Sequence, residues 1–126
     1  MTDHPRRWEP GPDHPITVEP ATGAVTVRVG TEVVAVTKRA LELREASYPP
    51  VYYVPSDEVR PGMLRPNHAH TYCPYKGEAS YYDPVLPDGR VLEGAVWSYP
   101  TPYPAVQAIA GHVAFYPDRV TVTAGS

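Results

Sequence analysis

Short segments in which apolar and polar residues alternate recur along the chain, and they predict strands. The clearest is 25–29 (VTVRV), in which valine occupies every second position, the period of a strand with one buried face. Gly30 and Thr31 suit a two-residue hairpin turn. We therefore expect residues 32–37 to return as the partner strand.

Similar patterns, bounded by proline and glycine, predict the other elements. Residues 39–45 fit a helix or a strand, and the alternation of Leu41 and Leu43 favours a strand. Residues 60–77 hold scattered prolines and glycines and are expected to be irregular. Further strands are expected at 16–19, 51–54, 79–82, 95–99, 113–116 and 119–123, the last two as an antiparallel pair, with one helical turn at 55–59.

Together these elements predict a mainly β fold, a small antiparallel two-sheet domain with one short helix near 104–110. Pro104 suits the first turn of that helix and Gly111 its exit. The 17 prolines exclude long helices over most of the chain. The length of 126 residues suits one domain, expected at 16–123. Residues 1–15 are polar and rich in proline, which predicts a flexible N-terminal arm.

Composition disfavours several partners and locations. The formal net charge is −3 and basic residues are scattered, so nucleic-acid binding is not expected. No apolar run approaches the ~20 residues of a membrane span, and we see no secretory signal. Cys73 is the single cysteine, which excludes an internal disulfide and fits a reducing cytoplasm. The expected state is a monomer or a small homo-oligomer.

Tyrosine is unusually abundant, with ten copies against one phenylalanine. A buried tyrosine hydroxyl needs a hydrogen-bond partner, which can be backbone, water or a ligand. Tyr53, Tyr81, Trp97 and Tyr99 fall in separate expected strands. If those faces converge, these side chains would line a polar aromatic pocket; ordinary core packing is the simpler alternative.

The densest set of reactive side chains lies between His68 and Glu78. Cys73 is a candidate nucleophile, with Lys76 as a nearby positive charge and His70 as a base. Strand alternation opposes a local pair, because His70 and Cys73 would face opposite ways, and a small buried residue is the alternative for Cys73. Lys76, beside Gly77, could bind an anion or form a Schiff base, or be an ordinary surface lysine.

Other patterns set limits on the chemistry. His68 and His70 would share a strand face as a metal pair does, but Cys73 and Pro74 stand where a carboxylate ligand would follow, so no metal is expected. The chain has no phosphate-binding glycine loop and no GxSxG elbow. Glu45 would face inward with Leu41 and Leu43, and an inward carboxylate needs a partner such as Arg44, Lys76 or a tyrosine hydroxyl.

Several of these segments resemble domain-of-unknown-function family 427, over roughly residues 16–122. They are Arg44-Glu45, residues 50–55, Asp57, Val59, residues 71–82 (TYCPYKGEASYY), residues 95–99, residues 109–111 and Phe115-Tyr116. The resemblance implies a small bacterial or fungal β-rich domain of two sheets that lean on each other like a tent. It also carries over Glu45, Tyr53, Asp57, His70, Thr71, Cys73, Lys76, Tyr81, Trp97 and Tyr99 as motif residues.

The family is sometimes filed as nucleotidyltransferase-like, but the chain lacks the DxD-spaced carboxylate pair of such enzymes. Other tent-like folds hold zinc with paired cysteines, which the single Cys73 cannot supply. We therefore predict a module that binds a small polar or anionic ligand, with Lys76 as counter-charge and Glu45 or Asp57 as acceptors. The alternatives are an enzyme that uses Cys73 or Lys76 as nucleophile, and a structural or interaction domain. No cofactor is indicated.

Overall fold

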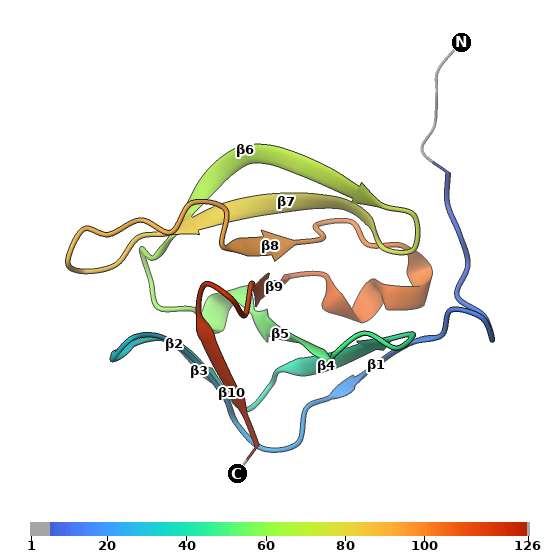
Figure 1. Cartoon of the computed structure of the whole chain (residues 1–126), viewed down its shortest axis with the longest axis horizontal. Coiled ribbons are helices and arrows are strands. Elements are labelled where there is room, and N and C mark those ends of the chain that lie inside the picture. The colour runs from blue at the N-terminus through green and yellow to red at the C-terminus, as the bar shows by residue number, and fades with distance from the viewer. Residues whose placement is uncertain (1–5, 126) are drawn as a thin grey trace.

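The computed structural model describes residues 6–125, which form ten strands and two short 3₁₀ helices (Figure 1). The strands are β1 (Ile16–Pro20), β2 (Val25–Val29), β3 (Glu32–Thr37), β4 (Leu41–Glu45), β5 (Val51–Pro55), β6 (Leu64–Cys73), β7 (Gly77–Pro84), β8 (Val96–Ser98), β9 (His112–Phe115) and β10 (Thr121–Ala124). The helices are η1 (Ser56–Glu58) and η2 (Pro104–Ile109). The mainly β prediction, with a short helix near 104–110, is confirmed. Within the described residues no helix is both long and apolar enough to span a bilayer.

The strands form two antiparallel sheets. The larger has the order β1-β4-β5-β9-β8-β7-β6, and the smaller has the order β10-β2-β3. The expected hairpin of β2 and β3 is present, with Val29 opposite Glu32. In the larger sheet β9 is the joint, because it pairs with β5 on one side and with β8 on the other.

Two expectations about individual elements were wrong. Residues 60–77 were expected to be irregular, yet residues 64–73 form β6, the outer strand of the larger sheet. An outer strand tolerates Pro66, because the backbone on its free side pairs with no neighbour. A register shift between Asn67 and His70 also interrupts the alternation that would have revealed this strand.

The second error concerns the last two strands. β9 and β10 were expected to pair with each other, but they belong to different sheets, and β10 pairs with β2. Short hairpins are the usual outcome for neighbouring strands. Here the segment from Tyr116 to Val120 instead closes on itself, since the N–H groups of Arg119 and Val120 both donate to the carbonyl of Tyr116.

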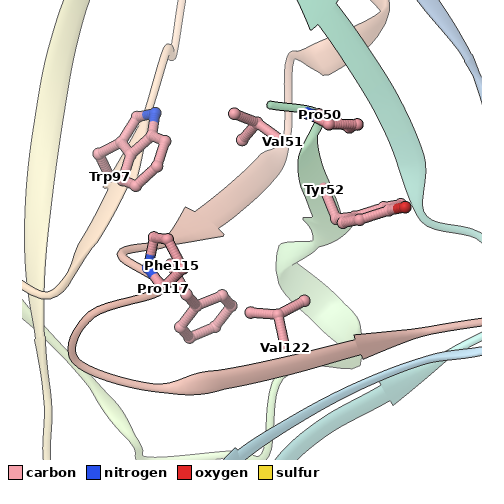
Figure 2. A pocket seen from close by; sticks show the side chains of 7 residues that line it. All are labelled: Pro50, Val51, Tyr52, Trp97, Phe115, Pro117 and Val122. Carbon is pink, nitrogen blue, oxygen red and sulfur yellow. The ribbon is translucent and has the colours of Figure 1, made fainter. Parts of the chain in front are cut away.

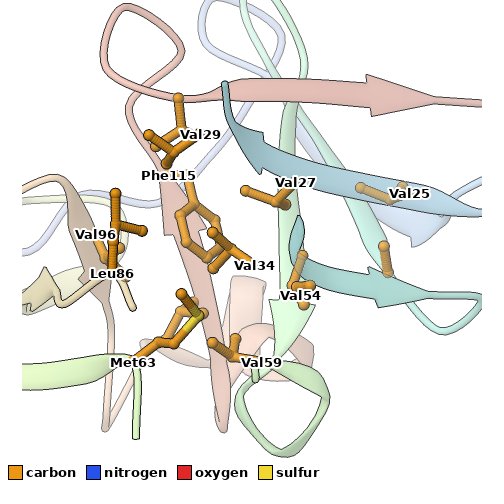
Figure 3. Packing of buried hydrophobic residues seen from close by; sticks show 14 residues of the cluster. Val25, Val27, Val29, Val34, Val54, Val59, Met63, Leu86, Val96 and Phe115 are labelled. Atoms are coloured by element: carbon orange, nitrogen blue, oxygen red, sulfur yellow. The ribbon is translucent and has the colours of Figure 1, made fainter. Parts of the chain in front are cut away.

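The main core lies between the two sheets. Valines from β2 and β3 face side chains from β5, β8 and β9, and Phe115 lies among them (Figure 3). Strand alternation selects these residues, because every second side chain of a strand points to the same face. In β5, Val54 therefore enters this core, while Tyr53 points to the opposite face.

The opposite face of the larger sheet carries a second cluster. It contains Leu43, Tyr53 and Ala114 from the sheet, together with Val106 and Ile109 from η2. η2 also contacts β1, so the helix covers one end of this face. Tyrosines, Trp97, Glu45 and Lys76 also lie on this face, and where they gather the apolar cluster gives way to a polar concavity.

Candidate functional site

A polar cavity of about 200 Å³ opens on this second face of the larger sheet. The lining residues are Leu43, Glu45, Val51, Tyr53, Lys76, Tyr81, Trp97, Tyr99 and Tyr116. Six of them, namely Glu45, Tyr53, Lys76, Tyr81, Trp97 and Tyr99, are among the site residues expected from the sequence. The structure therefore brings these six side chains together, although the first, Glu45, and the last, Tyr99, lie 54 positions apart in the sequence.

Glu45 and Lys76 reach the cavity from the ends of strands. Glu45 is the last residue of β4 and lies on the same face as Leu43, as the alternation predicts. Lys76 lies in the tight turn between β6 and β7, where its N–H donates to the carbonyl of Cys73 at 3.2 Å. Gly77 follows with φ of +112°, a conformation that glycine adopts far more readily than other residues.

Glu45 and Lys76 form an ion pair, in which Lys76 Nζ donates to Glu45 Oε1 at 2.5 Å. His14 Nε2 lies 2.7 Å from the second carboxylate oxygen, Oε2. The exposed fractions of the Lys76 and Glu45 side chains are 10% and 16%. Because both charges are largely removed from water, breaking the pair would leave a poorly solvated charge behind.

The protein environment lowers the pKa of Glu45 below its ordinary value. Burial by itself acts in the opposite direction, because it disfavours the charged carboxylate. The hydrogen bonds and charges of Lys76 and His14 together outweigh that effect. Glu45 is therefore an ionised acceptor at neutral pH.

Cys73 lies next to this pair, with its Sγ 3.6 Å from Lys76 Nζ. The thiol is free and partly buried, and it packs against the cluster that contains Tyr53 and Tyr99. The sequence-based pairing of Cys73 with Lys76 is thus present as a contact. Lys76 Nζ also lies 5.9 Å from the centre of the Tyr99 ring, which places an aromatic face near the ammonium group.

Tyrosine hydroxyls and an indole complete the polar wall. Trp97 Nε1 donates to the hydroxyl of Tyr53 at 3.3 Å, and the Trp97 ring packs on Tyr116 with centroids 4.5 Å apart. Burial raises the pKa of Tyr53 and Tyr99 far above the ordinary tyrosine value, and burial followed by the Tyr81 hydroxyl raises that of Tyr116 to about 12. These hydroxyls stay protonated at neutral pH, so each can both donate and accept.

A smaller apolar cavity of about 70 Å³ adjoins the polar one (Figure 2). It is lined by Pro50, Val51, Tyr52, Trp97, Phe115, Pro117 and Val122, and it shares Val51 and Trp97 with the polar cavity. Trp97 therefore has a polar hollow on one side, towards Tyr53, and an apolar hollow on the other, towards Phe115.

Four expected site residues lie outside the cavity lining, namely Cys73, described above, and Thr71, His70 and Asp57. Thr71 does not reach the cavity but contacts a residue that lines it, since its hydroxyl lies 2.7 Å from that of Tyr81. His70 is exposed on β6, opposite Ser80 in register, and belongs to the strand positions that face away from Cys73. Asp57 lies in η1 and pairs with Arg39 at 3.1 Å, with its side chain 76% exposed.

Sequence reasoning missed His14 and Tyr116. His14 precedes β1, and β1 pairs with β4 so that Ile16 lies opposite Glu45. That register brings a histidine two positions earlier next to the carboxylate, but it could be inferred only after β1 and β4 were known to pair. Tyr116 directly follows β9, and its neighbours Phe115 and Pro117 line the apolar cavity instead.

Metal-ligating side chains are dispersed: among residues 6–125, no three His, Cys, Asp or Glu side chains are placed so that they could hold a metal ion together. Glu45 lines the cavity and Cys73 lies next to it, and the side chain that contacts both of them is Lys76.

A family model described as "Domain of unknown function (DUF427)" matches residues 17–125. The matched stretch includes every residue that lines the polar cavity. A comparison with curated proteins gives no match.

Proposed function

Because the chain belongs to the DUF427 family, whose description assigns no activity, we propose its function from the polar cavity: the domain binds a small polar or anionic molecule there. The observation that supports this most directly is the ring of tyrosine hydroxyls around a largely buried Lys76–Glu45 pair. Hydroxyl groups that face a hollow can donate and accept further hydrogen bonds, and a bound ligand can supply the partners.

The size of the cavity limits the ligand. At ~30 Å³ per water molecule, 200 Å³ corresponds to about six or seven water-sized groups. A small hydroxy acid, amide or amino acid fits that space, whereas cavities for larger ligands reach ~300–1,000 Å³. A nucleoside triphosphate would extend well outside it, and the one carboxylate in the lining, Glu45, already binds Lys76 and His14.

The charges of the lining also determine which chemical groups of a ligand the cavity can recognise. Lys76 and Glu45 cancel each other formally, so the hydroxyls of Tyr53, Tyr81, Tyr99 and Tyr116 and the indole of Trp97 supply most of the recognition. Trp97 and Tyr116 also offer ring faces to a planar group such as a carboxylate or an amide.

Ligand-observed NMR with the full chain tests this proposal. The probes are glycolate, glycolamide, lactate, glycine and urea. We expect at least one to bind, and we expect the double variant Tyr99→Phe/Tyr116→Phe to bind it up to about tenfold more weakly, since it lacks two hydrogen-bonding groups but keeps both rings.

Tyr82→Phe is the matched control, because Tyr82 lies on β7 with its side chain on the opposite face of the sheet from Tyr81. It should bind as the wild type does. Absence of binding by every probe, or equal binding by the double variant and the wild type, would count against a ligand site and in favour of a structural or interaction domain.

The second candidate is an enzyme with Cys73 as nucleophile, which the 3.6 Å contact between its Sγ and Lys76 Nζ favours. A neighbouring ammonium group stabilises a thiolate, the reactive form of cysteine. Lys76 itself is less suited to attack a carbonyl, because an ammonium group paired with Glu45 offers no lone pair.

Alkylation by iodoacetamide at neutral pH separates this candidate from simple binding. An activated Cys73 should react much faster than a thiol in a short peptide, and Lys76→Met should slow that reaction at least tenfold. A rate equal to that of the peptide thiol, or unaffected by Lys76→Met, removes the nucleophile hypothesis and leaves the binding proposal standing.

A further inference from the structure

Residues 8–14, here called the N-terminal strap, lie against the turn that carries Lys76. The N–H of Trp8 donates to the carbonyl of Pro74 at 2.9 Å, and the Trp8 ring meets the ring of Tyr75 edge-on at 5.4 Å. Within the strap, Gly11 and His14 exchange two backbone hydrogen bonds. The strap therefore has a defined path that ends at His14.

His14 is fixed from both sides. Its ring stacks on Tyr75 with centroids 4.0 Å apart and an interplanar angle of 6°. Directly after it, the carbonyl of Pro15 accepts a hydrogen bond from the N–H of Ala46 at 2.8 Å, which ties the strap to the residue after Glu45. These contacts point Nε2 of His14 at Glu45 Oε2, at 2.7 Å.

The strap thus adds a third charged or titratable group to the Lys76–Glu45 pair. With a neutral imidazole the three side chains carry a formal net charge of zero, and with a protonated imidazole they carry +1. His14 does not line the cavity itself, and it acts through Glu45, whose other oxygen binds Lys76. A proton on His14 therefore changes the charge at the cavity wall without a new contact with the ligand.

We propose that His14 is a positioning residue of the polar cavity and that its charge sets ligand preference: carboxylates when the imidazole is protonated, neutral polar molecules when it is not. This inference rests on the function proposed above. When His14 is charged, it competes with Lys76 for the Glu45 carboxylate, so the ammonium group of Lys76 has more capacity to bind an anion. When His14 is neutral, the Glu45 carboxylate fully offsets Lys76.

The groups that face His14 are few. Glu45 from β4 and the Tyr75 phenol from the β6–β7 turn contact it, and Lys76 lies beyond Glu45. β1 begins with Ile16, Thr17 and Val18, none of which titrates. On the strap itself Glu9 pairs with Arg7, and Asp13 is exposed.

Two probes of the same shape but different charge test the inference. Glycolate is an anion and glycolamide is neutral, and both fit the cavity. Their affinities for the full chain would be measured by NMR at about pH 5.5 and about pH 8, because histidine is the side chain whose charge most readily changes between such values. We expect glycolate to bind about five- to tenfold more tightly at the lower pH, from one added charge near the site, and glycolamide to bind equally at both.

His14→Gln separates this role from a purely structural one. Glutamine can still donate a hydrogen bond to Glu45 but does not titrate, so the variant should stay folded and lose the pH dependence of glycolate binding. His68→Gln, on the exposed outer strand, should keep it. If His14→Gln retains the wild-type pH dependence, the inference is overturned; if neither probe binds any variant at either pH, the binding proposal fails instead.

Discussion

Glu45 accepts hydrogen bonds on both of its carboxylate oxygens, and this pairing has a consequence for acid stability. Hydrogen bonds from Lys76 and His14 outweigh the opposing effect of burial and lower the pKa of Glu45 in the folded state. The folded protein therefore holds this proton less tightly than the unfolded chain. The carboxylate stabilises the fold above its unfolded-state pKa, and this stabilisation is lost as the pH falls through the lowered, folded-state pKa.

We therefore expect Glu45→Gln to unfold more easily than the wild type at pH 7, by about 1–3 kcal/mol, because Lys76 loses its ionic partner. The difference in unfolding free energy should shrink as the pH falls from about 5 to below 4, where the wild-type carboxyl group also becomes protonated. Urea unfolding across this range measures it. Glu78→Gln, at an exposed position of β7, should show almost no difference at either end.

The hydroxyl of Tyr53 provides a second prediction for a single residue. Tyr53 is 1% exposed and accepts the indole N–H of Trp97. Tyr53→Phe keeps the ring but leaves that N–H without its partner, so unfolding should require about 1 kcal/mol less. Tyr48→Phe removes a hydroxyl that is 65% exposed and should be neutral; equal effects of the two substitutions would show that the Trp97 contact contributes nothing.

Among the elements, the β6–β7 turn is the one on which the site depends most. Gly77 has φ of +112°, and a Cβ there would meet the carbonyl oxygen of Thr101 at 3.4 Å. We expect Gly77→Ala to destabilise the fold by about 1–3 kcal/mol, chiefly through backbone strain, and to weaken ligand binding by displacing Lys76. Gly11→Ala has neither a positive φ nor any atom within 4 Å of the new Cβ, so chemical denaturation should find it close to wild type.

Elements with a clean alternation were predictable from sequence, and those that rely on distant neighbours were not. The valines of β2 and the turn at Gly30 specified a hairpin that the structure confirms. β6 lacks such a pattern, because much of its length is exposed and Asn67 interrupts it, where its Oδ1 accepts the N–H of Ala69. Local hydrogen bonds of this kind satisfy the backbone at a bulge but leave no periodic trace in the sequence.

The residues of the site were likewise predictable only where a local sequence pattern marks them. Glu45, Lys76 and Trp97 could be proposed because a polar side chain on an otherwise apolar strand face, or beside a glycine in a turn, is unusual. Asp57 carried no such information, and it pairs with Arg39 away from the cavity. His14 reaches Glu45 through the pairing of β1 with β4, a long-range contact that no single stretch of sequence contains.

At the scale of the whole molecule, the two faces of the larger sheet should unfold together. The smaller sheet contributes its valines to the shared core (Figure 3), while Trp97 packs against the second cluster, on the other face of the larger sheet. A chain of this size whose two sheets share one core should unfold in a single transition. A substitution that destabilises the core should therefore also lower the stability of the structure around the polar cavity.

Val27→Ala, at a position with 0% exposure in β2, tests this coupling. It should lower the free energy of unfolding by about 2 kcal/mol through lost burial and the void that remains. In a Trp8→Phe background, fluorescence from Trp97 and far-UV circular dichroism should shift to the same new midpoint. Separate midpoints for the two signals would mean that the sheets unfold independently.

The place of β9 between β5 and β8 also constrains how a nascent chain can fold. Before residues 112–115 emerge from the ribosome, only three separate pieces can pair: β1 with β4 and β5, β2 with β3, and β6 with β7 and β8. β5 and β8 each present an unpaired edge during that interval, and such edges are the surfaces through which unfinished proteins aggregate. Production in cells should therefore depend on how quickly translation passes from β8 to β9, and a slow codon cluster between them would lower the soluble yield more than one placed earlier.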